Sequence, residues 1–172
     1  MPDQAARLLE GCGVCHARKM KGRKLLWAWM GLVLAGSLSC AAQEKGIWRA
    51  ESSTAKTITG DVVISTEKLA INFSNFPIAQ IRALEPAEAS AAFDAESGTG
   101  GSGNLYRLSI PAEKRFLHRN TLCGGEETQW MATYVVGHSL QVAFFSGASM
   151  PVFTADALAN ATSLCGTFSY VR

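Results

Sequence analysis

Apolar and polar residues alternate with a period of two through most of the chain after residue 46. Leu69, Ile71 and Phe73, for example, alternate with polar or small residues. This period is typical of a β-strand with one buried face, because successive side chains of a strand point to opposite faces. Similar stretches predict about eight strands, near residues 47–51, 58–65, 68–73, 77–84, 106–110, 130–136, 140–144 and 164–170.

Short turns separate several of these strands. Three two-residue connections leave room only for a tight turn, which makes consecutive strands antiparallel neighbours. They are Thr66-Glu67, Ser74-Asn75 and Gly137-His138. One apolar face per strand requires the sheet to close or fold on itself. We therefore expect an all-β fold, either a small antiparallel up-and-down barrel or a two-sheet sandwich of about eight strands. In a barrel, the last strand would pair with residues 47–51.

Two longer connections interrupt the strands, and each is expected to hold a short helix. The first begins at Pro86 and continues into the glycine-rich stretch Gly98–Gly103, which lacks the Lys-Ser/Thr of a phosphate loop. A tolerated surface insertion is the favoured interpretation, and a mobile flap over the barrel mouth is the alternative.

The second connection, residues 111–120, has proline at its start and asparagine at its end, which indicates a short helix. A helix there would place four side chains largely on one face, where they could bind a carboxylate or phosphate group. These candidate anion-binding residues are Lys114, Arg115, His118 and Arg119. The alternative is a solvated connector.

Near the N-terminus, the basic stretch Met20–Lys24 precedes the apolar run Leu25–Leu38, a combination typical of an export signal. A run of this length is shorter than the roughly 20 residues that span a bilayer as a helix, which favours cleavage after Ala41 or Ala42. We therefore divide the chain into an unstructured upstream extension (1–19), a signal peptide (20–42) and a single exported β domain (43–172). The domain would be periplasmic or secreted.

The N-terminal cysteines offer two alternatives to simple export. Cys40 is a candidate lipidation site, which would leave the protein anchored to a membrane. Cys12, Cys15 and His16 match the C-x-x-C-H pattern of covalent haem attachment. The basic residues that follow keep this segment on the cytoplasmic side, whereas c-type haem is attached on the far side. A membrane-anchored haem protein is therefore a distant alternative.

The exported domain retains two cysteines. In an oxidising compartment an isolated pair is expected to form a disulfide, Cys123–Cys165. His118 and His138 do not fall at metal-ligand spacing with either cysteine, so we expect neither a metal site nor a cofactor.

Charge differs between the two parts of the chain. Residues 1–42 carry six basic and two acidic side chains, whereas residues 43–172 carry ten basic and twelve acidic ones. A domain with a slight negative net charge lacks the basic footprint needed to bind a phosphate backbone, so nucleic acid is not an expected partner.

Aromatic residues occur in nearly every expected strand, and a small barrel either packs such side chains inside or encloses one small ligand. In size and strand content, with its single disulfide, the domain also resembles the periplasmic lysozyme inhibitors, which implies binding to a protein. No functional residue is transferred from that resemblance.

We expect a monomeric, non-catalytic binding protein of the cell envelope. It would be of the protein-inhibitor type or a lipocalin-like binder, and its partner would be an envelope protein or a small apolar ligand. Contact with a membrane is expected only through the signal segment or a lipidated Cys40. The alternative is a periplasmic enzyme with a cleft near His118. It ranks second because no serine near either histidine lies in a nucleophile-elbow pattern.

Overall fold

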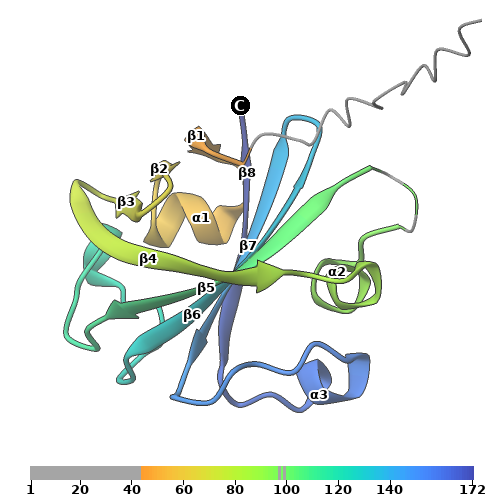
Figure 1. Cartoon of the computed structure of the whole chain (residues 1–172). Coiled ribbons are helices and arrows are strands. Elements are labelled where there is room, and N and C mark those ends of the chain that lie inside the picture. The colour runs from red at the N-terminus through yellow and green to blue at the C-terminus, as the bar shows by residue number, and fades with distance from the viewer. Residues whose placement is uncertain (1–43, 97, 99) are drawn as a thin grey trace, which may run out of the picture. The chain divides into compact units, whose positions relative to one another are not determined.

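The fold is an eight-stranded antiparallel barrel, taken from a computed structural model that describes residues 44–96, 98 and 100–172 (Figure 1). Each strand pairs with its neighbours in sequence, and β1 closes the ring against β8, with Arg49 opposite Val171 and Ala50 opposite Tyr170. The strands are β1 (Gly46–Ala50), β2 (Val62–Ile64), β3 (Lys68–Ile71), β4 (Ser74–Ala83), β5 (Ser102–Ile110), β6 (Thr128–Val136), β7 (Ser139–Ser146) and β8 (Leu164–Val171). The all-β prediction is confirmed, and its barrel alternative is the one observed.

Short helical segments occupy the longer connections: α1 (Ser53–Ile58), α2 (Pro86–Phe93), the 3-10 turn η1 (Leu117–Arg119) and α3 (Ala155–Ala159). The helix predicted from Pro86 is confirmed as α2, whose first turn is closed by reciprocal hydrogen bonds between Glu85 and Glu88. The short helices α1 and α3 are not predicted by the sequence pattern. Among the described residues, no helix is long and apolar enough to cross a membrane.

The predicted signal segment lies outside the described residues. The same holds for the lipidation candidate Cys40 and for the C-x-x-C-H residues Cys12, Cys15 and His16.

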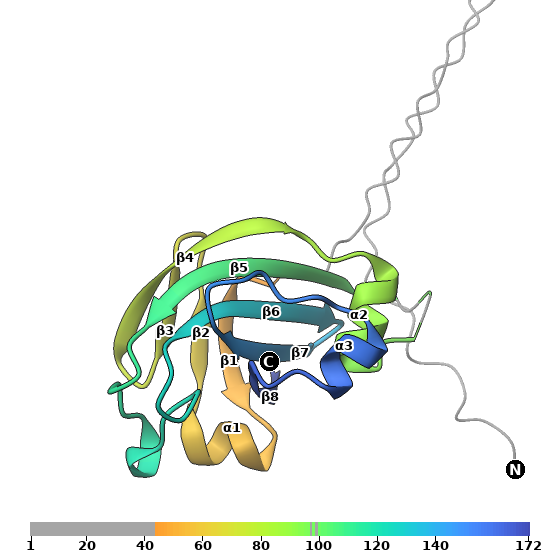
Figure 2. The same ribbon diagram turned by 90° about the horizontal axis from the view of Figure 1, so that it is seen from below.

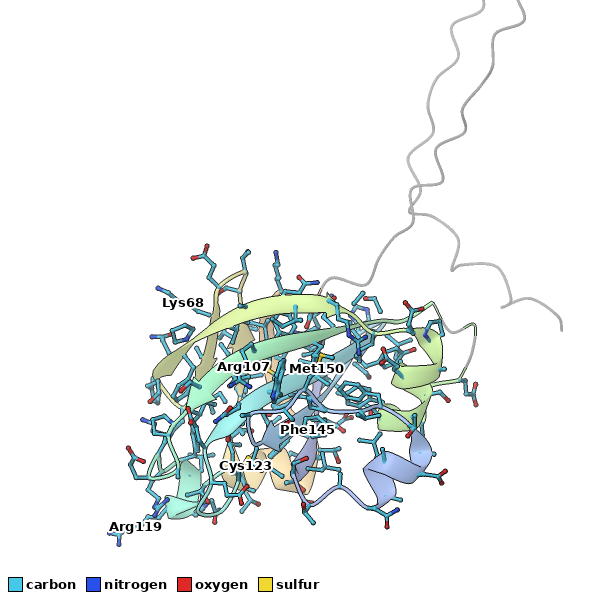
Figure 3. All side chains as sticks on the ribbon, turned by 60° about the horizontal axis from the view of Figure 1, so that its bottom comes forward. Lys68, Arg107, Arg119, Cys123, Phe145 and Met150 are labelled. Carbon is cyan, nitrogen blue, oxygen red and sulfur yellow. A yellow bond between two sulfur atoms is a disulfide. The ribbon has the colours of Figure 1, made fainter. Side chains whose placement is uncertain are left out.

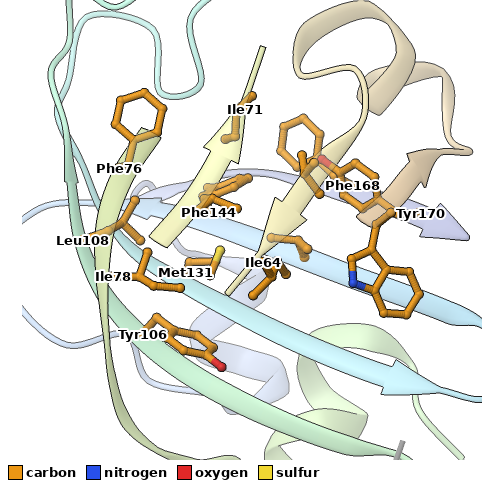
Figure 4. Packing of buried hydrophobic residues seen from close by; sticks show 14 of the residues in the cluster. Ile64, Ile71, Phe76, Ile78, Tyr106, Leu108, Met131, Phe144, Phe168 and Tyr170 are labelled. Atoms are coloured by element: carbon orange, nitrogen blue, oxygen red, sulfur yellow. The ribbon is translucent and has the colours of Figure 1, made fainter. Parts of the chain in front are cut away.

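Aromatic and aliphatic side chains fill the barrel interior (Figure 4). Trp48, Phe144, Phe168 and Tyr170 are each at most 1% exposed, and the rings of Phe144 and Phe168 meet edge to face with centroids 5.4 Å apart. Such dense packing is the ordinary state of a protein core. A small barrel either packs aromatic side chains inside or encloses one small ligand, and the first arrangement is the one observed.

A second apolar cluster lies on the outer face of β5, β6 and β7. Trp130, Ala132 and Tyr134 of β6 belong to it, whereas Met131 and Val135 of the same strand belong to the interior cluster. Residues from α2 and from the β7–β8 connection cover this outer face, and Figure 2 shows α2 and α3 beside one another there. The expectation of one apolar face per strand is therefore wrong for β6, because the helices provide a second buried side.

The disulfide predicted between Cys123 and Cys165 is present, with the two Cα atoms 4.8 Å apart. It joins the β5–β6 connection to the second residue of β8. A cross-link that closes 42 residues stabilises the fold by about 4 kcal/mol in the chain-entropy model. The long β5–β6 connection is consequently fixed to the barrel at its far end.

Candidate functional site

The β3–β4 turn carries the most exposed large apolar side chain among the described residues. Phe73 is 102% exposed, whereas the other exposed large apolar side chains of the described chain range from 39% to 68%. A ring this exposed contributes nothing to packing of the barrel. It is therefore free to meet another molecule.

The backbone of this turn is strained at the same residue. Ile71 is opposite Ser74, which leaves Asn72 and Phe73 as a two-residue turn with φ values of 45° and 62°. Both values lie in the left-handed region that a type I′ hairpin turn requires. Asparagine tolerates that region, but an ordinary side chain such as phenylalanine pays roughly 1–2 kcal/mol for it. The predicted turn at Ser74-Asn75 is wrong by two residues, because β4 already begins at Ser74.

The connection of residues 111–120 lies directly against this turn. The Nζ of Lys114 donates a hydrogen bond to the Oγ of Ser74, the residue after Phe73, at 2.6 Å. Next to it, Phe116 is buried, and its ring lies 6.0 Å from that of Phe76. We call the Asn72-Phe73 turn together with residues 111–120 the tip site.

Residues 111–120 do not form the predicted helix. Only η1 is helical, and His118 (φ 54°) and Arg119 (φ 64°) are consecutive left-handed residues within and at the end of it. The Phe116 N–H donates instead to the Asn120 carbonyl at 2.8 Å, which closes a compact loop. Two consecutive left-handed residues are incompatible with a continuing right-handed helix. The helix prediction is therefore wrong here.

The loop is also fastened to α1. The Asn120 side-chain amide donates to the Thr57 carbonyl at 3.3 Å. Leu117 approaches Gly60 so closely that a Cβ on that glycine would lie 3.1 Å from the leucine Cδ1. These contacts, with the disulfide and the buried Phe116, hold the loop in one arrangement.

The four candidate anion-binding residues are thus all in one short loop, but they do not line one helical face. Lys114 is half-buried and turned toward the β3–β4 turn, with its Nζ 6.0 Å from the centre of the Phe76 ring. Arg115, His118 and Arg119 are exposed, and Figure 3 shows Arg119 projecting away from the body of the molecule. Arg115 donates to the Ala112 carbonyl of its own loop at 3.2 Å.

Among the described residues, no carboxylate lies within salt-bridge distance of these cations. Across the residues that the structure places, the one salt bridge joins Arg82 to Glu88, far along β4 from the tip site. Residues 111–120 contain three permanently cationic side chains and a single acidic one, Glu113, for a net charge of +2. The tip site therefore combines one apolar knob with unpaired positive charge.

Other features of the described chain offer less chemistry. Two pockets of the described chain are lined by α2 with the glycine-rich segment and by the β7–β8 connection, and neither includes His118. Within the described ranges, no group of three or more histidine, cysteine or acidic side chains is placed to hold a metal ion. The glycine-rich segment packs closely on β6, since a Cβ on Gly103 would lie 2.8 Å from the Thr133 carbonyl.

One polar cluster occupies the other end of the barrel. The Oε2 of Glu44 accepts hydrogen bonds from the Asn104 amide (2.6 Å) and the Tyr106 hydroxyl (2.9 Å). Burial, followed by the nearby Glu44 charge, raises the pKa of the Tyr106 phenol. The Trp48 indole N–H donates to the Glu44 carbonyl at 2.8 Å. These bonds fasten the start of β1 across the barrel opening, which is a structural role.

Comparison with known proteins adds nothing to this geometry: the chain matches no family model, no curated protein and no solved structure.

Phe73 is the tip-site residue whose position differs from the one predicted by the sequence. Its position in the alternation with Leu69 and Ile71 assigned it to a buried strand face. The available signal was the preceding Asn72, a residue that favours left-handed turn positions.

Proposed function

We propose that this chain is an exported, non-catalytic binding protein that docks onto another protein through the tip site. The observation that carries the proposal is Phe73, a fully exposed aromatic ring on a strained and well-fixed turn. Aromatic and arginine side chains dominate the energetics of protein interfaces, and the tip site presents both types.

The packed interior of the barrel supports a protein partner over a small apolar ligand. Side chains such as Trp48 and Phe144 occupy the volume that a lipocalin-like ligand would need. The rigidity of the tip site points the same way, because a preorganised loop loses little conformational entropy when it binds. The protein-inhibitor type of binding fits a protruding, preformed loop of this kind.

The function is tested by comparing the proteins that the exported chain retains from an envelope extract of its own host. Immobilised wild-type protein, the Phe73→Gly variant and the Ile47→Ala variant are used in parallel. Ile47 is the matched control because it is 68% exposed on β1, away from the tip site. A protein retained by wild type and Ile47→Ala but lost with Phe73→Gly is the expected result. Identical sets for all three would overturn the proposal.

We further propose export through cleavage of the signal segment, giving a monomer in the periplasm or outside the cell. The intact mass of the exported product tests this step. We expect the mass of residues 43–172 or 42–172, less two hydrogens for the Cys123–Cys165 disulfide. A product that begins at Cys40 with added lipid would establish an anchored form instead. A product that retains residue 1 would contradict cleavage.

A further inference from the structure

Resting on the proposed function, we infer that the partner is a protein whose contact surface holds an apolar recess bordered by carboxylates. Phe73 would enter the recess, and the cations of residues 111–120 would face the acidic border.

The recess follows from the shape and fixation of the turn. The Phe73 ring is fully exposed, and its backbone is locked by the pairing of Ile71 with Ser74. A single rigid apolar knob is complementary to a concave apolar surface, where it loses contact with water on all sides. A flat surface would bury only part of the ring.

The acidic border follows from charge and from the chemistry of the side chains. Arg115 and Arg119 are exposed, and no carboxylate lies within salt-bridge distance of either among the described residues. Guanidinium groups pair with carboxylates through two parallel hydrogen bonds, so a partner with acidic side chains gains both attraction and orientation. Lys114 stays bound to Ser74, the residue after Phe73, and keeps a third positive charge next to the turn.

An anionic membrane is the other surface that attracts an aromatic residue among cations. A single myristoyl chain gives only marginal membrane binding, and one phenylalanine ring buries far less apolar surface than such a chain. A lipid surface also gains nothing from the left-handed geometry of Phe73, because lipids adapt to a flexible side chain equally well. The fixed geometry therefore favours a protein.

The test uses a photo-crosslinker at the centre of the site. The full chain with Phe73→p-benzoylphenylalanine is expressed in its own host and irradiated, alone or combined with Arg115→Glu and Arg119→Glu. Lys68→Glu is the matched control, since it makes the same type of charge reversal at an exposed position at the other end of β3. Thermal unfolding of each variant verifies that the fold is retained.

We expect a polypeptide adduct whose yield falls about tenfold with the double arginine reversal and is unchanged by Lys68→Glu. An adduct insensitive to the arginine reversal would overturn the acidic border and leave docking through Phe73 standing. Absence of any adduct would overturn the proposed function as well. Adducts to lipid alone, with cosedimentation on phosphatidylglycerol vesicles, would replace the protein partner with a membrane.

Discussion

Replacing Phe73 by glycine is expected to make the protein more stable and to abolish its binding at the same time. At φ 62° the Cβ of phenylalanine strains the backbone sterically, whereas glycine has no Cβ and is not strained. The ring is fully exposed, so its removal loses no packing. The variant also creates Asn-Gly, the sequence that type I′ hairpin turns prefer.

The size of the gain follows from two opposing contributions. Relief of the left-handed strain contributes roughly 1–2 kcal/mol, and the extra conformational freedom of glycine in the unfolded chain costs about 0.5–1 kcal/mol. The free energy of unfolding should therefore rise by about 0.5–1 kcal/mol. For a domain of this size that corresponds to a melting temperature about 2–4 °C higher.

The assay is urea and thermal unfolding of the exported domain, with Phe73→Ala as the control. Alanine removes the ring but keeps the Cβ, so it should lose binding without the gain in stability. A glycine variant less stable than wild type would show that the ring packs on the barrel. Equal stability of the alanine and glycine variants would refute the strain argument.

Two further predictions concern the barrel itself. The double variant Cys123→Ser/Cys165→Ser should lose about 4 kcal/mol of unfolding free energy in urea titrations, because the cross-link closes a 42-residue loop; an unchanged midpoint would show that the disulfide leaves the unfolded chain unrestrained. Burial raises the pKa values of Tyr106 and Tyr170, so their neutral phenols favour the folded state. That contribution is fully present below the pKa of an unfolded tyrosine, about 10, and is lost as the pH rises further. Phenolate absorbance and circular dichroism recorded against pH should therefore show these two tyrosines ionising only as the barrel unfolds, and ionisation of both in the folded protein would contradict the burial argument.

The sequence predicts the barrel well because its interior depends on a simple alternation. Leu69 and Ile71 on β3, and Phe168 and Tyr170 on β8, all lie inside as their period of two indicates. The pattern is ambiguous on β6, where Trp130 and Met131 are both buried but on opposite faces. The period of two indicates which side chains are buried, but it does not indicate which element covers the second face of a strand such as β6.

The tip site was less predictable for a different reason. The basic residues of 111–120 could be identified from composition, but the helix assigned to them assumed right-handed backbone throughout. The conformations of His118 and Arg119 depend on tertiary contacts, including the Phe116–Asn120 backbone bond and the Asn120 contact with Thr57. Local propensity does not contain those contacts.

The positions where local rules fail give the strongest argument for where this protein acts. Five residues other than glycine are left-handed in the described part of the chain. Asn72, His118 and Asp94, which lies at the end of α2, belong to residue types that are enriched in this region. The other two, Phe73 and Arg119, are both exposed and both lie in the tip site. Side-chain packing does not offset the backbone strain at these residues, since their side chains are in solvent. Backbone strain that packing does not offset is found at functional surfaces, and its presence at Phe73 and Arg119 supports the proposal that the tip site is where this protein binds its partner.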